Sequence, residues 1–507
     1  MFKKLLIANR GEIAVRIMRT CRDMGITSVA VYSEADATAL HTRYADEAYC
    51  IGPAPAAESY LDASKIIETA LACGAEAIHP GYGFLSERAE FGRACAEAGI
   101  IFVGPSPETL RKLGDKVEAR RIADKVGVPS VPGSDGRVTP EAALALAPQV
   151  GFPLLIKAAA GGGGKGIRLV EDASTLEESL RVAAQEAQAS FGDDGLYLER
   201  YLDPVRHIEV QVLADRHGAV VHLGERECSV QRRSQKVVEE SPSVAVDAAL
   251  RERLGAAAVA IAREAGYENA GTIEFLLDTA GSFYFIEANA RLQVEHPVTE
   301  FVTGLDLVRE QLRIAAGEPL GFAQADVDLR GWAIECRITA EDADNGFMPG
   351  LGVAHHVSEP SGPGVRVDSC LFDGCEVGPH YDSLLSKLIV YGADREQALA
   401  RVRRALGEYQ VLGVKTTLPF HRRLADDAAF IAGEIDTRFL DRSFHFEAPG
   451  TEHDDHALAV AALLSHQRRS NGTPNGAAAS GMSRWKASSR QAAVDRAPGG
   501  GRWRSTS

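Results

Sequence analysis

Paired carboxylates on a short predicted hairpin are the residues of this chain with the clearest capacity for chemistry. Residues 283–296 read Phe-Tyr-Phe-Ile-Glu-Ala-Asn-Ala-Arg-Leu-Gln-Val-Glu-His, so ionisable or amide side chains alternate with apolar or small ones from Glu287 onward. Side chains two residues apart in a strand share a face of the sheet. The pattern therefore predicts that Glu287, Asn289 and Arg291 project together.

A partner strand is predicted at residues 272–278, and Thr-Ala-Gly-Ser at 279–282 supplies the turn residues between the two. Pairing of Asp278 with Phe283 would place Glu274 directly opposite Glu287. Like charges that face each other across a sheet are destabilising, so such a pair is either solvated or shared by a cation.

The other face of this hairpin is predicted to be apolar, because it would carry Ile273, Phe275, Tyr284 and Ile286. A solvated hairpin face is the alternative for the polar side. Two carboxylates and an amide oxygen, however, form the hard ligand set that suits Mg²⁺ or Mn²⁺ held together with substrate phosphates. We therefore predict that Glu274, Glu287 and Asn289 bind a metal ion.

A glycine-rich loop is the second informative feature. Four consecutive glycines (Gly161, Gly162, Gly163 and Gly164) precede Lys165, and such a run leaves backbone amides free to approach an anion closely. Strand-forming runs at 152–157 and 167–170 flank the loop, so it is predicted to tip a hairpin. A dinucleotide fingerprint needs strand, turn and then helix, and a P-loop needs Ser or Thr after the lysine, where this chain has Gly166. The remaining alternative is a flexible linker.

Together the two hairpins resemble the ATP-grasp superfamily, and within it the match narrows to biotin carboxylase. The motifs that carry the resemblance, in family order and near-family spacing, are Ile7–Ala14, His79–Glu87, Gly114–Lys116, Lys157–Gly166, Arg206–Gln211, Gln231–Lys236, Glu287–Glu295 and Glu335–Ile338. They span about residues 1–445. One position departs from the pattern, since the family commonly has His where this chain has Ser234, in a segment near the nucleotide.

The resemblance implies a fold that is part α/β and part α+β. Residues 1–112 are expected to form an N-terminal βαβ, Rossmann-like (pre-ATP-grasp) domain, and the alternation of strands at 5–8, 29–33 and 76–79 with helices at 13–23 and 63–72 independently predicts a parallel sheet. An ATP-grasp domain is expected at 113–330, with a mobile lid at about 131–203. A β-rich, barrel-sandwich-like domain with a helix at 395–406 is expected at 331–445, and a basic, flexible tail at 446–507.

For the nucleotide, the resemblance implies that lysines and backbone amides neutralise the phosphates of ATP, while Mg²⁺ or Mn²⁺ supplies further charge at one or two sites. The residues expected to bind nucleotide or the other substrates are Tyr82, Lys116, Lys157, Gly161, Gly162, Gly163, Gly164, Lys165, Glu199, Leu202, His207, Gln231, Gln293 and Val294. Taken alone, a histidine such as His207 is more often a satisfied structural residue.

For the carboxylation itself, the resemblance implies that Arg291, Gln293 and the Val294 backbone hold bicarbonate, with Lys236 beside it. A planar guanidinium suits a planar carboxylate-like anion. Glu295 is then the base that makes bicarbonate a nucleophile toward the γ-phosphate, and Arg337 stabilises the biotin enolate. The sequence alone does not decide between these roles and the alternative that Glu295 and Arg337 form a buried ion pair.

Composition limits the classes of partner. The net charge is −15, which argues against nucleic-acid binding by the body of the chain. Residues 467–507 hold seven Arg and one Lys against one Asp, and the resulting tail is predicted to be solvated or partner-dependent. No apolar run approaches the ~20 residues of a membrane span. Eight scattered cysteines without a CxxC pair, and an N-terminus unlike a signal peptide, predict a cytoplasmic protein.

The expected partners are a second copy of the chain as a homodimer, a separate biotin carboxyl carrier protein and a carboxyltransferase subunit. Residues 446–507 lack a Met-Lys-Met-like biotinylation sequence, since Met482 is followed by Ser483. The expected activity is that of an ADP-forming, ATP-dependent carbon–nitrogen ligase, in acetyl-CoA carboxylase or in a propionyl-CoA, methylcrotonyl-CoA or pyruvate carboxylase. The separate carboxyltransferase is expected to select the acyl or keto acceptor.

Other functions are less consistent with these residues. An aminoimidazole ribonucleotide carboxylase or a carbamoyl-phosphate synthetase domain would not account for the run from Arg291 to His296 or for the C-terminal module. A catalytically silent ATP-grasp scaffold would not need Glu274, Glu287 and Glu295 together. A dinucleotide oxidoreductase is disfavoured by the strands on both sides of the glycine loop.

Overall fold

The computed structural model describes residues 1–158, 167–191, 194–442, 444, 459–464 and 466. The chain divides into two compact units, residues 1–446 and 447–507. In the second unit the described residues 459–464 are helical. No helix of the described residues is both long and apolar enough to cross a membrane. The glycine loop at 161–166 lies outside the described residues, so its expected part in a lid stays a prediction.

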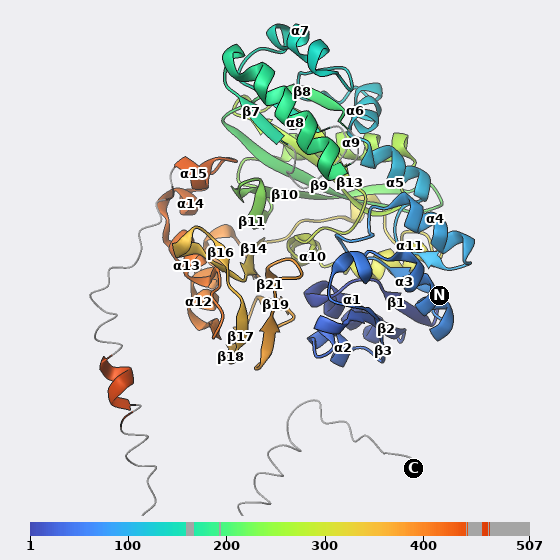
Figure 1. The fold of residues 1–507 in the computed structure, drawn as a ribbon, viewed down its shortest axis with the longest axis vertical. Coiled ribbons are helices and arrows are strands. Elements are labelled where there is room, and N and C mark those ends of the chain that lie inside the picture. The colour runs from blue at the N-terminus through green and yellow to red at the C-terminus, as the bar shows by residue number, and fades with distance from the viewer. Residues whose placement is uncertain (159–166, 192–193, 443, 445–458, 465, 467–507) are drawn as a thin grey trace, which may run out of the picture. The chain divides into compact units, whose positions relative to one another are not determined.

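The N-terminal part of the first unit is a parallel five-stranded sheet in the order β3-β2-β1-β4-β5, shown in blue in Figure 1. Its elements are β1 (Lys4–Ile7), α1 (Gly11–Asp23), β2 (Thr27–Ser33), α2 (Leu40–Tyr44), β3 (Glu47–Gly52), α3 (Ala63–Cys73), β4 (Ala77–His79), α4 (Ala89–Glu97) and β5 (Ile101–Phe102). Leu5, Leu6 and Ile7 are fully buried, as expected for a parallel strand covered on both faces. The predicted βαβ sheet is confirmed.

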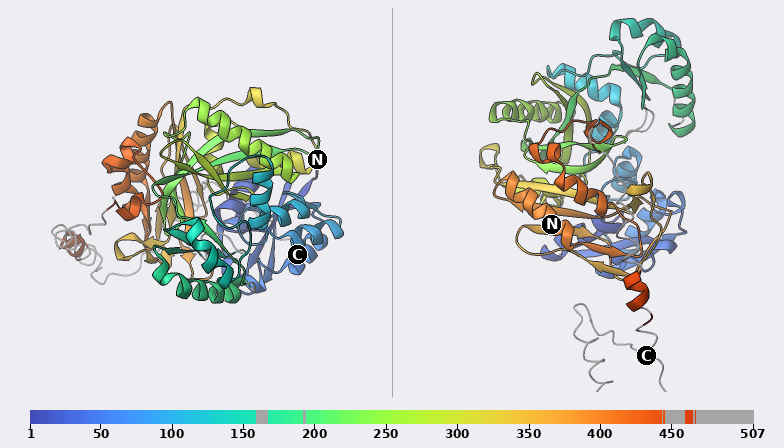
Figure 2. Two further views of the ribbon diagram at one scale, coloured as in Figure 1. Left: turned by 90° about the horizontal axis from the view of Figure 1, so that it is seen from above. Right: turned by 90° about the vertical axis from the view of Figure 1, so that its left-hand side faces the viewer.

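A small three-stranded unit follows the helices α5 (Pro107–Gly114) and α6 (Lys116–Lys125). It consists of α7 (Pro140–Val150), β6 (Leu154–Ala158), β7 (Ile167–Val170), α8 (Leu176–Phe191) and β8 (Leu196–Arg200), with strand order β7-β6-β8. β6 pairs antiparallel with β7, from Leu154–Val170 to Lys157–Ile167, so the predicted hairpin is confirmed on both sides of the glycine loop. This three-stranded part projects from the rest of residues 1–446 in two views (Figures 1 and 2).

The central element is an eight-stranded sheet in the order β13-β12-β9-β10-β11-β14-β21-β19. Its first part comprises β9 (Val205–Ala214), β10 (Val220–Arg232), β11 (Gln235–Ser241), β12 (Asn269–Asp278) and β13 (Phe283–Asn289), with helices α9 (Ala248–Ala265), α10 (His296–Thr303) and α11 (Leu307–Ala315). β11 pairs with β14 (Trp332–Thr339). One continuous sheet therefore runs across the expected domain boundary near residue 330.

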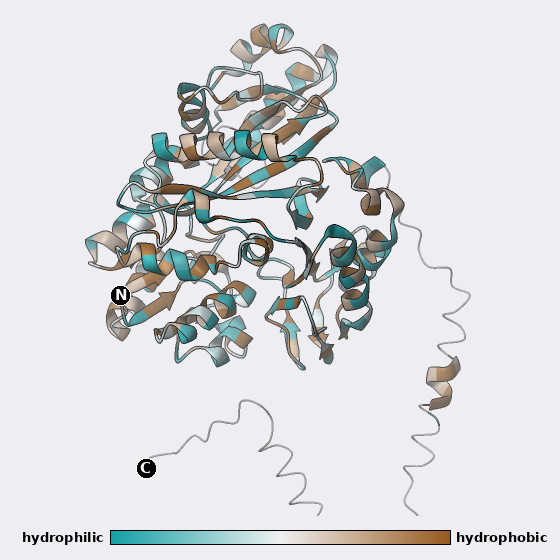
Figure 3. Ribbon diagram, turned by 180° about the vertical axis from the view of Figure 1, so that it is seen from behind, coloured by the Kyte–Doolittle hydropathy of each residue, from teal (hydrophilic) through white to brown (hydrophobic). Residues whose placement is uncertain are grey.

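The remaining C-terminal elements are short strands and helices around the far end of that sheet. They are β15 (Glu341–Asp342), β16 (Met348–Pro349), β17 (Gly352–Ala354), β18 (His356–Ser358), β19 (Val365–Ser369), β20 (Cys375–Val377), β21 (Leu384–Gly392), α12 (Arg395–Glu408), β22 (Gln410–Leu412), α13 (Leu418–Asp426), α14 (Ala428–Ala432) and α15 (Phe439–Arg442). Five 3₁₀ turns complete the described residues, at Glu34–Asp36, Ala56–Glu58, Ala173–Thr175, Gln324–Asp326 and Ala343–Asn345. Hydrophilic and hydrophobic residues are interspersed along the helices drawn in Figure 3, as expected where one face of a helix packs on a core.

The β12–β13 hairpin departs from the simple register expected from the sequence. Glu274 does face Glu287, but a β-bulge follows, and Phe275 then pairs with Phe285 and Leu277 with Phe283. The predicted Asp278–Phe283 pairing is therefore wrong. Because the bulge adds one residue on β13, it exchanges the faces beyond it. Phe283 and Phe285 are buried there, while the expected core residues Tyr284 and Ile286 are only half-buried.

Candidate active site

A row of three carboxylates crosses the central sheet. Glu287 on β13 pairs with Glu274 on β12, and Glu274 pairs with Glu209 on β9, so the three side chains lie on one face. We call Glu287, Glu274 and Glu209 the acidic row. Glu274 and Asn289 are buried, so the solvated-face alternative is wrong for these two residues of the hairpin, while Glu287 is half-buried.

Cations hold each member of the acidic row. Lys116 Nζ lies 3.2 Å from Glu287 Oε2, and Lys236 Nζ lies 2.9 Å from Glu274 Oε1, whose other oxygen is 2.8 Å from His207 Nε2. Arg226, which is directly opposite Glu209 on β10, forms a fully buried ion pair with it. Facing carboxylates are therefore tolerated because each one has a positive partner.

Lys236 contacts three carboxylates of the site. Its Nζ lies 2.6 Å from Glu209 Oε2, 2.9 Å from Glu274 Oε1 and 2.7 Å from Glu295 Oε1. Burial alone would lower the pKa of Lys236, but the surrounding carboxylates hold it well above its usual range. The Lys236 ammonium therefore stays positively charged, and it can also bind an anion that enters the site beside the three carboxylates.

Glu295 ends the loop of residues 290–295 between β13 and α10, which we call the site loop. Its second oxygen, Oε2, lies 2.9 Å from Arg337 Nη2. Burial would raise the pKa of Glu295, but Lys236 and Arg337 hold it well below its usual range, so it is a carboxylate at neutral pH. The buried ion pair that the sequence left open is present.

A second carboxylate, Glu239, accepts a hydrogen bond from Arg337 Nε at 2.6 Å. Burial raises the pKa of Glu239 to about 7, although Arg337 opposes the shift. Two carboxylates on one guanidinium thus differ widely in their pKa values. Such a separation is typical of sites that move protons.

The other side chains of the site loop support one another. Arg291 donates from Nη1 to Gln293 Oε1 at 2.9 Å and from Nη2 to Asn289 Oδ1 at 3.0 Å. Asn289 Nδ2 in turn donates to Glu274 Oε1 at 2.8 Å. Arg291, Gln293 and Glu295 are therefore brought together beside the acidic row, and the Asn289 oxygen predicted to bind metal is engaged by Arg291.

Several of the predicted nucleotide residues contact one another or a neighbouring charged side chain. Lys157 forms an ion pair with Glu199, whose other oxygen lies 2.5 Å from Arg120 Nη1. Gln231 and His207 contact each other at 2.7 Å between Nε2 and Nδ1. Leu202 is half-buried just after β8. Gly161, Gly162, Gly163, Gly164 and Lys165 lie outside the described residues.

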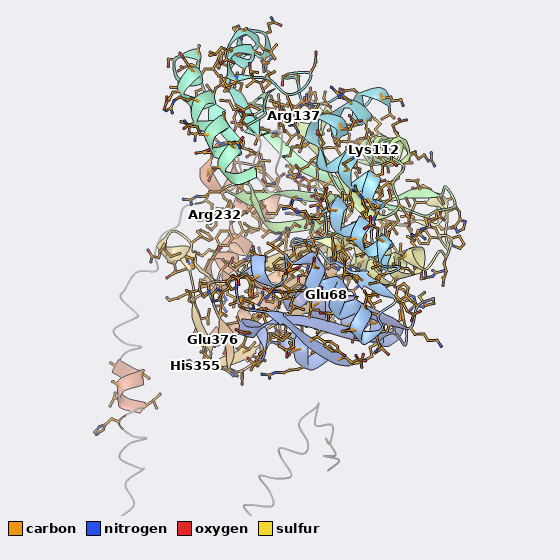
Figure 4. The ribbon with its side chains drawn as sticks, turned by 45° about the vertical axis from the view of Figure 1, so that its right-hand side comes forward. Glu68, Lys112, Arg137, Arg232, His355 and Glu376 are labelled. Atoms are coloured by element: carbon orange, nitrogen blue, oxygen red, sulfur yellow. The ribbon has the colours of Figure 1, made fainter. Side chains whose placement is uncertain are left out.

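Tyr82 and Ser234 are two further positions that the sequence singles out. Tyr82 is half-buried, and its hydroxyl has no hydrogen-bond partner among the described residues. Ser234 is exposed in the turn between β10 and β11, where φ is +62°. Next to that turn, Arg232 packs its guanidinium over the Phe347 ring at 3.8 Å and is labelled in Figure 4.

Sequence reasoning missed Glu209, Arg226 and Glu239 as members of the site. The alternation in His207-Ile208-Glu209-Val210-Gln211 does indicate a polar face on β9. The partners of that face, however, come from strands far away in the sequence, and only the sheet register identifies them.

The donor set fits a hard divalent cation. Ligand atoms of His207, Glu209 and Glu274 lie within 4.8 Å of one another, as do those of Glu209, Cys228 and Glu295. The acidic row adds Glu287, whose side chain is 27% exposed to solvent and contacts Lys116. Oxygen ligands dominate the row, as Mg²⁺ and Mn²⁺ prefer.

Comparison with known proteins agrees with this geometry. Three family models match in succession: biotin carboxylase, N-terminal domain, at residues 1–110; carbamoyl-phosphate synthase L chain, ATP binding domain, at 115–323; and biotin carboxylase C-terminal domain at 335–442. Biotin carboxylase 1 of Bacillus subtilis is 51% identical over 443 residues, covering 87% of this chain and 98% of the relative. The biotin carboxylase of Pseudomonas aeruginosa is 52% identical over 444 residues, covering 87% and 98%.

A solved structure shares the fold of most of this chain. The biotin carboxylase domain dimer of Hydrogenobacter thermophilus 2-oxoglutarate carboxylase, in complex with MgADP, ADP and bicarbonate, superposes with a TM-score of 0.87 at 48% identity. The match covers 89% of this chain and 100% of that one.

Proposed function

Because the chain belongs to the biotin carboxylase family, we propose that its buried charge cluster performs the ATP- and bicarbonate-dependent carboxylation of biotin. The chain is an ATP-dependent enzyme of this class. The observation that carries the assignment of the site is the convergence of Lys236, Glu295 and Arg337 beside the acidic row.

In this proposal bicarbonate lies between the site loop and Lys236. Arg291, Gln293 and the Val294 amide supply fixed donors, and Lys236 contributes positive charge. The anion competes with Glu295 for its cations, which raises the basicity of that carboxylate when bicarbonate is bound. Glu295 then accepts the bicarbonate proton, and the freed oxygen attacks the γ-phosphate.

The products of that step are ADP and carboxyphosphate, which breaks down to carbon dioxide and phosphate. Phosphate takes the proton from the ureido nitrogen of biotin, and the nitrogen then attacks carbon dioxide to form carboxybiotin. Arg337 is the fixed cation proposed to stabilise the biotin enolate. Glu274 and Glu287 would hold Mg²⁺ or Mn²⁺, which supplies positive charge to the phosphates during transfer.

On the nucleotide side, Lys116 and Lys157 are the lysines proposed to contact phosphates. Each is held by a carboxylate, Glu287 or Glu199. When ATP binds, these ammonium groups therefore have to leave their carboxylate partners and contact phosphate instead. Residues 161–165 are also proposed to contact the phosphates. This part of the proposal rests on the sequence alone, because these residues lie outside the described ones.

The proposed setting is a carboxylase complex in the cytoplasm. All eight cysteines are free thiols, which suits a reducing compartment. The proposed partners are a biotin carboxyl carrier protein, a carboxyltransferase that selects the acceptor, and a second copy of the chain, as in the Hydrogenobacter dimer.

The test is ATP turnover by the purified full chain with Mg²⁺. Turnover is expected to need bicarbonate and to rise when free biotin is added, because biotin consumes carbon dioxide at the site. ATP hydrolysis that is indifferent to bicarbonate would exclude this function.

A further inference from the structure

Lys387, on β21, is a fully buried lysine without a role in the mechanism above. Its Nζ donates a hydrogen bond to the backbone carbonyl of Val294 at 2.9 Å. Two carboxylates balance its charge from other elements: Glu12 Oε2 on α1 at 3.3 Å and Asp368 Oδ2 on β19 at 3.9 Å. Burying an ammonium is costly unless it is paired, and these three partners together offset that cost.

The position of Lys387 in the sheet links it to the active site. It pairs directly with Arg337 on one side and with Asp368 on the other. Two cations facing each other are destabilising by themselves. The arrangement is held because Arg337 is bound to Glu239 and Glu295, while Lys387 is bound to the carboxylates on its own side.

The Val294 carbonyl belongs to the peptide group that joins Val294 to Glu295. A charged donor on that oxygen fixes the plane of this peptide group, because hydrogen bonds to charged groups are short and strong. The peptide plane sets the direction in which the Glu295 side chain leaves the backbone. It also restrains Val294, whose own amide is a proposed donor to bicarbonate.

We propose that Lys387 is a positioning residue for bicarbonate, which fixes the site loop through the Val294 carbonyl and ties it to α1 through Glu12. The proposal rests on the function assigned to the loop above. It predicts that loss of Lys387 loosens the bicarbonate site while the nucleotide side, formed by other elements, is retained.

The main test is the Lys387→Met variant of the full chain, assayed with ATP, Mg²⁺, bicarbonate and free biotin. The KM for bicarbonate is expected to rise about tenfold or more, since a hydrogen bond from a charged group is lost, while the KM for ATP stays within about twofold. Arg395→Met is the matched control. Arg395 is a largely buried cation that binds Glu240 and the Phe430 carbonyl, away from the site loop. Its loss is expected to lower Tm without moving the KM for bicarbonate.

The double variant Glu12→Gln, Lys387→Met guards against misfolding of the single one, because it removes both buried charges together. It is expected to show the same rise in the KM for bicarbonate, while Glu12→Gln alone keeps the Val294 contact and a KM near wild type. An unchanged KM for bicarbonate in the folded double variant, or a rise equal to that of Arg395→Met, would overturn the role of Lys387. Bicarbonate-independent turnover by the wild type would instead overturn the proposed function.

Discussion

Two buried ion networks in this chain use the same residue types in different ways. The first, which we call the structural network, consists of Arg16, Glu300, Asp306, Arg366 and Asp368. Arg16 Nη2 lies 2.7 Å from both Glu300 and Asp306, and Arg366 bridges Glu300 at 2.7 Å and Asp368 at 2.6 Å. The second network is the active site around Lys236, where one ammonium is shared by three carboxylates.

The pKa shifts separate the two networks. Burial would raise the pKa of Glu300 and of Asp368, but their arginine partners lower both below the usual range. In the active site the pKa values of Glu274 and Glu295 are lowered, whereas burial raises the pKa of Glu209 and Glu239. A network that only holds elements together can balance every charge. In a network that must bind anions and a metal and accept a proton, some carboxylates have lowered pKa values and others have raised ones.

The largest expected effect that distinguishes the networks is on rate. Glu274→Gln removes one charge from the acidic row and is expected to lower kcat about a hundredfold or more, because metal charge at a phosphoryl transfer is lost. The measurement is biotin-stimulated ATP turnover over a range of Mg²⁺ concentrations. A near-normal rate at ordinary Mg²⁺ would mean that the row does not hold the metal.

Glu300→Gln is the matched change in the structural network, since Glu300 is also a buried glutamate between two cations. It leaves Arg16 and Arg366 short of a partner and is expected to reduce the free energy of unfolding by about 3 kcal/mol. The kcat of the folded enzyme should stay near wild type. Denaturant titration and the turnover assay together check this, and a hundredfold loss of kcat without a loss of stability would erase the contrast.

A smaller effect should appear in the pH dependence of stability. Both oxygens of Glu335, opposite Glu239 on the sheet, lack a hydrogen-bond partner among the described residues, and burial raises the pKa of Glu335 well above 4.5. The folded state therefore holds this proton when the unfolded state has lost it, so the contribution of Glu335 to stability falls as pH rises above about 4.5. Glu335→Gln should stabilise the chain by about 1–3 kcal/mol at pH 8 and much less at pH 5. Equal changes of Tm at both pH values would speak against a buried, titrating Glu335.

The sequence predicted those parts of the site whose partners are close along the chain. The register predicted for one hairpin places Glu274 opposite Glu287, and this pair is confirmed although the Asp278–Phe283 pairing behind it is wrong, because the bulge shifts the register by one residue. The same reasoning failed two residues away, because nothing in the local pattern marks the bulge that brings Phe285 rather than Ile286 into the core.

Long-range pairing was beyond the reach of periodicity. Glu209 joins the acidic row only through the register of β9 with β12, and Lys387 reaches Val294 only because β21 continues the central sheet past β14. Strand register between distant segments is set by the packing of the whole sheet, which a reading of single segments does not contain.

Glu295 gives the most direct test of the central claim, that the network around Lys236, whose carboxylates have both raised and lowered pKa values, is the catalytic one. ATP turnover by Glu295→Gln should be measured with and without bicarbonate, beside Glu300→Gln. Glu295→Gln is expected to lose bicarbonate-dependent turnover by about a hundredfold or more, as expected for removal of a general base, while ATP still raises its Tm. Glu300→Gln should keep that turnover. Wild-type bicarbonate dependence in Glu295→Gln would contradict the account.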